Sequence, residues 1–231
     1  LFGTESWRYL ALLWSLVPLV NGLYFTAVPV PGVLAKGHSL GVKGLFKTKL
    51  FYVFALLMLC SGASEIAMSQ WASFFAESGL RGSKTAGDLL GPCLFAALMG
   101  ISRVVYAGLS DKLSLTKVMT VSGIGCAVCY LVASRSPVSL VALAGCALCG
   151  LFVGIMWPAT FSLAAQRLPS GGTVMFALLA LFGDLGCASG PATVGRLATF
   201  FGGELSLGLL FAAVFPLVLV SVLLFMRKKE K

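Results

Sequence analysis

Long apolar stretches alternate with short polar segments along the whole chain. A helix needs roughly 20 apolar residues to cross the hydrocarbon layer of a membrane. Seven stretches are about that long: residues 9–30, 50–75, 86–109, 116–133, 138–163, 173–201 and 205–226. We therefore predict an all-α membrane protein with seven transmembrane helices. The sixth of them carries Gly190 and Pro191, a pair at which membrane helices can kink.

The composition supports this prediction and excludes other classes of protein. Of the 231 residues, 58% are hydrophobic and 11% are charged, whereas a soluble domain is about half apolar and about a quarter charged. The bases that give a formal net charge of +9 sit mostly in short clusters between the apolar stretches. This pattern excludes a soluble globule, a disordered tail and a nucleic-acid-binding domain, so we expect the lipid bilayer as a partner and no nucleic acid.

Lys and Arg residues predict which ends of the helices face the cytoplasm. Eleven of them lie on the side that holds segment 33–49 and the C-terminus, and five lie on the other side. Cytoplasmic loops carry the excess of Lys and Arg. We therefore predict a multi-pass protein of the plasma membrane with its N-terminus outside and its C-terminus in the cytoplasm.

The seven cysteines all lie in apolar stretches. Two Cys-x-x-Cys pairs, Cys126/Cys129 and Cys146/Cys149, have the spacing of a four-cysteine zinc site. Their surroundings contain no charge and few polar groups, which favours thiols that pack as small hydrophobic side chains. We expect no metal and no other cofactor.

Charged residues inside the apolar stretches include Glu65, Asp88, Arg103 and Asp184. Such a group costs at least about 2.5 kcal/mol in hydrocarbon, so it usually faces a cavity or a partner. Glu65 shares a helix face with Ser61 and Ser69, which suits a water-lined path and the binding and release of a proton. For each deep acid, a purely structural hydrogen bond is the alternative.

Other residues suit either ligand binding or packing. Trp71 and Trp157 can stack on a sugar ring or fill a helix interface. Glycines beside Asp184, and the Gly150-xxx-Gly154 spacing, predict close helix contacts. The only His lies in a polar loop and no paired catalytic groups share one depth, so we expect no enzyme.

Sequence motifs indicate a family. Residues 100–112 read GISRVVYAGLSDK and resemble the second copy of the loop motif of the major facilitator superfamily, with Arg103, Gly108, Asp111 and Lys112 as the gating-loop residues. The basic run that follows is reduced to Lys117. Residues 150–163 and 183–195 resemble the fucose permease type. A repeated GD…GP pattern in residues 87–92 and 183–191 is consistent with two three-helix repeats that are inverted in the membrane.

The resemblance implies a domain organisation. Residues 1–32 would be the last helix of a truncated N-terminal half, residues 33–49 a basic cytoplasmic linker, and residues 50–231 a six-helix C-terminal half. The missing N-terminal half is then an expected partner. By the same resemblance, spans 50–75 and 138–163 line the central cavity.

This organisation places Glu65, Gln70, Trp71 and Trp157 on cavity helices as candidate solute or proton-binding residues, with Asp184 on a flanking helix. We expect secondary active transport of a small solute by alternating access, as a proton-coupled symporter for a sugar or another polar metabolite. A drug or metabolite exporter of the same fold is one alternative, and a seven-helix receptor or interaction protein is another.

Overall fold

The computed structural model describes residues 7–29, 40–80, 89–109 and 114–228. The chain divides into two compact units, Leu1–Gly37 and His38–Lys231, and each is described by itself. The described part of the first unit is helix α1 (Trp7–Ala27), which is apolar along its length and contains Pro18. It is long and apolar enough to cross a membrane.

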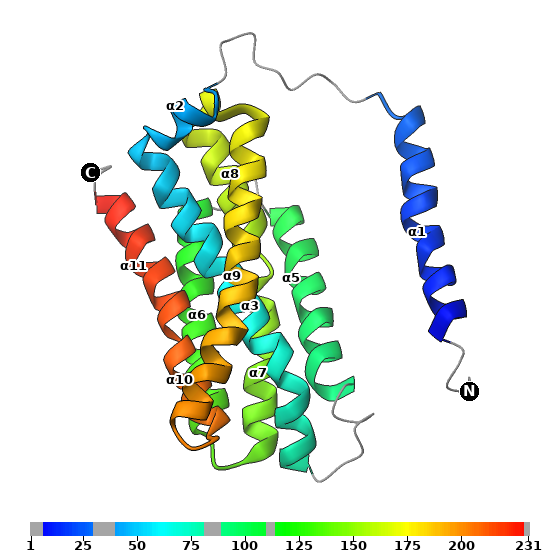
Figure 1. The fold of residues 1–231 in the computed structure, drawn as a ribbon, viewed down its shortest axis with the longest axis vertical. Coiled ribbons are helices and arrows are strands. Elements are labelled where there is room, and N and C mark those ends of the chain that lie inside the picture. Colours follow the sequence, from blue (N-terminus) through cyan, green and yellow to red (C-terminus); the bar gives the residue numbers. More distant parts are fainter. Residues whose placement is uncertain (1–6, 30–39, 81–88, 110–113, 229–231) are drawn as a thin grey trace. The chain divides into compact units, whose positions relative to one another are not determined.

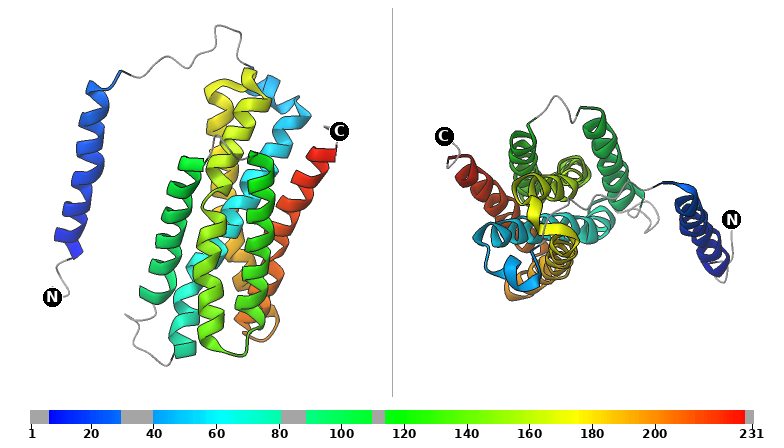
Figure 2. Two further views of the ribbon diagram at one scale, coloured as in Figure 1. Left: turned by 180° about the vertical axis from the view of Figure 1, so that it is seen from behind. Right: turned by 90° about the horizontal axis from the view of Figure 1, so that it is seen from above.

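The second unit is a bundle of long helices that run up and down beside one another (Figures 1 and 2). Its elements are α2 (Val42–Phe46), α3 (Lys49–Leu80), η1 (Leu89–Cys93), α5 (Leu94–Leu109), α6 (Leu115–Arg135), α7 (Ser139–Val153), α8 (Met156–Arg167), η2 (Pro169–Gly171), α9 (Gly172–Phe200), α10 (Leu205–Ala212) and α11 (Val214–Lys228). No strand occurs among the described residues, and seven segments qualify as membrane spans. The predicted all-α fold with seven transmembrane helices is confirmed.

Prolines accompany two helix breaks and one π-helical turn in the predicted spans, which the apolar pattern does not show. Span 138–163 is interrupted between α7 and α8, just before Pro158. Span 205–226 is interrupted between α10 and α11, just before Pro216. In the described part of span 86–109, the π-helical turn η1 contains Pro92 and leads directly into α5. By contrast, α9 continues through Pro191 as one helix of 29 residues.

Helices α3 and α9 share the most extensive contact among the described helices, and glycines let their backbones touch along this seam. A side chain added at Gly186 would meet the carbonyl oxygen of Leu59, and one added at Gly190 would lie 2.6 Å from the carbonyl oxygen of Ala63. Close approach of this kind is what small residues permit between membrane helices.

The predicted contact through Gly150 and Gly154 is also present. A side chain at Gly150 would meet the carbonyl oxygen of Phe95, and one at Gly154 would lie 2.8 Å from the carbonyl oxygen of Met99. Both partners belong to α5, so this spacing brings α5 against α7 and the break that follows it.

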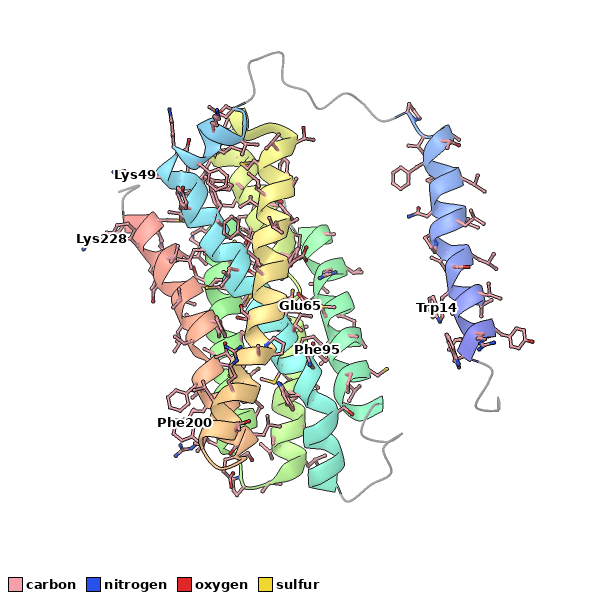
Figure 3. The ribbon with its side chains drawn as sticks, viewed as in Figure 1. Trp14, Lys49, Glu65, Phe95, Phe200 and Lys228 are labelled. Atoms are coloured by element: carbon pink, nitrogen blue, oxygen red, sulfur yellow. The ribbon has the colours of Figure 1, made fainter. Side chains whose placement is uncertain are left out.

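One end of the bundle is basic. Lys49 begins α3, Lys117 lies in the first turn of α6, and Arg167 and Lys228 end α8 and α11. Figure 3 shows the labelled Lys49 and Lys228 at the same end, whereas Phe200 lies towards the other.

Candidate solute and proton site

Glu65 lies near the middle of α3, and Figure 3 shows it between the two ends of the bundle. Its side chain is half-buried, as is that of Ser69 one turn later. Ser61, one turn earlier, is fully buried and donates a hydrogen bond to the carbonyl oxygen of Leu57 at 2.8 Å. The predicted polar stripe is therefore accessible at Glu65 and Ser69, while Ser61 is committed to its own helix.

Groups on three other helices lie within electrostatic range of the Glu65 carboxylate. Arg103 of α5, Cys149 of α7 and Cys187 of α9 are all near enough to interact with it electrostatically. None of the residues that the structure describes forms an ion pair with Glu65. The acid thus lies on a helix that packs against α7 and α9, with an α5 cation in electrostatic range and no ion-pair partner among the described residues.

Asp184 shares this neighbourhood, although it comes from α9. Its side chain is exposed, and the Cys187 thiol one turn later interacts electrostatically with both Asp184 and Glu65. A side chain added at Gly62 of α3 would lie 3.0 Å from the sulfur of Cys187. The α3–α9 seam therefore brings the two deep acids to the same part of the bundle.

Trp157 joins the same region from the start of α8. Its indole ring covers Gly183, where an added side chain would lie 2.6 Å from the ring. The ring is half-buried and lies edge-on to Phe161 with a centroid distance of 6.2 Å. Its Nε1 is buried and has no hydrogen-bond partner among the described residues. An unmet buried donor costs about 1–3 kcal/mol, so this N–H is a group for which a ligand could supply an acceptor.

Gln70 and Trp71 lie further along α3, beyond this region. Gln70 is exposed and Trp71 is half-buried. The Trp71 ring packs over Gly195 of α9, where an added side chain would lie 3.5 Å away. The two tryptophans therefore contact the same helix at different levels.

Arg103 holds the break between α7 and α8. Pro158 has no backbone N–H, so the carbonyl oxygen of Gly154 loses the donor that an uninterrupted helix would give it. The Nε of Arg103 donates to this oxygen at 3.0 Å, and its Nη2 lies 3.7 Å from the sulfur of Met99. A side chain from α5 thus satisfies a carbonyl that a proline on another helix has freed.

The rest of the predicted gating loop is only partly described. Asp111 and Lys112 lie outside the described residues, as does Asp88. Gly108 is exposed, and a side chain added there would meet nothing within 4 Å. Among these gating-loop residues, the structure defines hydrogen-bond contacts for Arg103. Its Nε contacts the Gly154 carbonyl oxygen at the helix break.

The two cysteine pairs face each other across α6 and α7. Cys126, Cys129, Cys146 and Cys149 are all buried, and the sulfur atoms of Cys126 and Cys149 are 3.6 Å apart. Among the described residues, no group of three or more His, Cys, Asp or Glu side chains is arranged to hold a metal ion.

Comparison with known families decides the class of protein. The family model of the Major Facilitator Superfamily matches residues 1–191. The chain belongs to this superfamily. No curated protein and no solved structure matches it.

Membership in the Major Facilitator Superfamily makes the chain part of a membrane transporter family, whose members are generally not enzymes. Of the classes considered from the sequence, transport is therefore the one with support. The fucose permease subgroup stays a prediction.

The helix break, and the hydrogen bond of Arg103 at it, were not predicted from the sequence. The signal was present, because Trp157-Pro158 interrupts an apolar span and a proline always frees the carbonyl four residues earlier. The donor could not be found in this way, since Arg103 lies 51 residues from Gly154 in the sequence.

Proposed function

We propose that this chain is part of a secondary active transporter that moves a small polar solute by alternating access and couples it to protons. The observation that carries the proposal is Glu65: a half-buried acid in the middle of a membrane helix, with an α5 cation in electrostatic range and without an ion-pair partner among the described residues. Ionisable groups at such positions usually belong to ion or substrate pathways.

Arg103 provides a route from protonation to movement. The ionised Glu65 attracts Arg103, whereas a protonated Glu65 does not. Arg103 also holds the Gly154 carbonyl oxygen at the helix break. Proton binding at Glu65 would therefore change the position that Arg103 prefers. This would in turn strengthen or weaken the hydrogen bond from Arg103 to the Gly154 carbonyl oxygen at the junction of α7 and α8.

Trp157 and Asp184 are the proposed solute contacts beside Glu65. The Trp157 indole offers an apolar ring face and an N–H without a partner among the described residues. Asp184 offers an exposed carboxylate. A hydroxyl-rich solute such as a sugar can accept from the indole and donate to the carboxylate. Gln70 and Trp71 would contact the solute at a second level of the pathway.

The proposed architecture follows the family. In it, α1 is the sixth helix, and two inverted three-helix repeats, from α3 to α6 and from α7 to α11, form the C-terminal half. An N-terminal half would complete the cavity. The basic end of the bundle supports a cytoplasmic C-terminus, because cytoplasmic ends carry the excess of Lys and Arg.

Uptake by cells that express the transporter with its N-terminal half tests this proposal. A panel of labelled monosaccharides would be offered with and without a proton gradient. We expect Glu65→Gln to abolish gradient-driven accumulation while exchange of solute across the membrane continues, since the amide keeps the shape but binds no proton. Glu204→Gln is the matched control because Glu204 is exposed in the turn before α10. Unchanged accumulation in Glu65→Gln would remove this acid from the mechanism.

A further inference from the structure

A cavity of about 440 Å³ lies away from the Glu65 region, between α5 and α6. Figure 2 shows these two helices on either side of α7, and residues of α7 and of the break after it form the floor. The volume falls within the ~300–1,000 Å³ typical of ligand sites. Nothing in the proposed transport mechanism uses this space.

Most of the cavity wall is apolar and opens at the surface. Val105 of α5 and Val121 of α6 line it and are 53% and 63% exposed, while Ile155 of the helix break is half-buried. In a membrane protein, such exposed apolar side chains face acyl chains. The occupant therefore enters from the bilayer and presents a hydrocarbon chain to these residues.

The polar groups of the cavity are ordered along its length. Lys117 and Tyr106 lie at the basic end of the bundle, in the first turn of α6 and the last turn of α5. Ser102 lies one helical turn deeper, is 4% exposed, and has a hydroxyl without a hydrogen-bond partner among the described residues. No carboxylate lines the described part of the cavity. A cation at the mouth, a free hydroxyl below it and apolar walls together match an anionic amphiphile.

We propose that this cleft binds an anionic glycerophospholipid. The phosphate lies at Lys117 and Tyr106, an ester carbonyl accepts from the Ser102 hydroxyl, and one acyl chain runs along Val105, Val121 and Ile155. This is the order of phosphate, ester and chain in the lipid itself. Basic pockets between membrane helices at the cytoplasmic side are known to favour such head groups.

Photo-crosslinking in lipid nanodiscs tests the site on the whole 231-residue chain. The probes are phosphatidylglycerol and phosphatidylcholine, each with a diazirine at the end of one acyl chain, and labelled residues are mapped by mass spectrometry. We expect phosphatidylglycerol to label the segments of α5, α6 and α7 that line the cleft, and phosphatidylcholine to label them weakly.

Three variants distinguish a built site from general lipid contact. Lys117→Gln should lower the phosphatidylglycerol label by about fivefold, which corresponds to the ~1 kcal/mol that one basic residue contributes at an anionic surface. Val121→Trp fills the cleft and should also lower it. Val128→Trp is the matched control, because Val128 is equally apolar and 51% exposed on α6 but does not line the cavity.

The inference is overturned if both lipids label the cleft equally, or if Lys117→Gln and Val121→Trp leave the label unchanged while each variant remains a single species in size-exclusion chromatography. Preferential labelling by a diazirine fatty acid, with no label from phosphatidylglycerol, would overturn it as well. The crosslinking experiment measures lipid binding and not transport, so its outcome is independent of the proposed role of Glu65.

Discussion

Two helix interfaces of the bundle each involve a proline, and they are built in different ways. At the α3–α9 seam, glycines bring the backbones into contact and α9 continues through Pro191. At the α5–α7 interface, glycines also permit close contact, but the span breaks before Pro158 and an Arg103 side chain holds the freed carbonyl oxygen. The first interface is fixed by backbone packing. The second combines glycine-mediated backbone contact with one side-chain hydrogen bond at a helix break.

The strongest test of this contrast is a methyl group added to the seam. Gly186→Ala places a Cβ against the carbonyl oxygen of Leu59, and backbone atoms cannot move aside cheaply. We expect a loss of about 1–3 kcal/mol in the free energy of unfolding, as for other overpacked interfaces. Denaturation in mixed detergent micelles, followed by circular dichroism, would measure it.

Gly100→Ala on α5 is the control for that change. Nothing lies within 4 Å of a side chain added there. Alanine is favoured over glycine in a helix by about 0.5–1 kcal/mol, so this variant should be neutral or slightly more stable. Equal destabilisation by both changes would contradict the description of the seam.

The second prediction concerns the link between Arg103 and the break. Pro158→Ala restores an N–H that can donate to the Gly154 carbonyl oxygen, so the donor from Arg103 is no longer needed. We expect Arg103→Met to cost about 1–2 kcal/mol more in the parent chain than in the Pro158→Ala background. A double-mutant cycle on the free energy of unfolding measures this coupling.

The cycle is the appropriate measurement because removing a charge from a membrane helix has its own effect on stability, which cancels between the two backgrounds. Met99→Leu alters the other contact of the guanidinium and should show no coupling to Pro158→Ala. A coupling energy of zero for Arg103 and Pro158 would show that the hydrogen bond does not hold the break.

A smaller effect is expected at Trp157, which connects the two interfaces by packing on Gly183. Trp157→Phe removes the Nε1–H, which has no partner among the described residues, and keeps an aromatic ring. Because no hydrogen bond is lost, we expect the free energy of unfolding to fall by no more than about 1 kcal/mol, from lost ring contacts. The proposed solute contact predicts a higher KM for transport of the preferred sugar. An unchanged KM would assign Trp157 to packing alone.

The fold was largely predictable from the sequence because membrane spans are set by length and hydrophobicity. The close contact through Gly150 and Gly154 was also predictable, since small residues four apart lie on one helix face. The different outcomes at Pro158 and Pro191 were not. Both prolines free a carbonyl, yet the span breaks before Pro158 and continues through Pro191.

The candidate site was predicted residue by residue but not as an arrangement. Charge within an apolar span identified Glu65 and Asp184 as unusual. Their shared position beside Cys187 depends on the glycine seam, which is a property of two helices together. The burial of Ser61 was likewise not predictable, because it depends on the packing of neighbouring helices and not on the sequence of α3 alone.

Proton flux measures whether Glu65 carries the coupled proton. The transporter with its N-terminal half would be reconstituted in weakly buffered liposomes, and external pH recorded when the preferred sugar is added. We expect the medium to become more alkaline as sugar and protons enter together, and Glu65→Gln to abolish this change while sugar exchange continues. A proton flux in Glu65→Gln equal to that of the parent would contradict this role of Glu65.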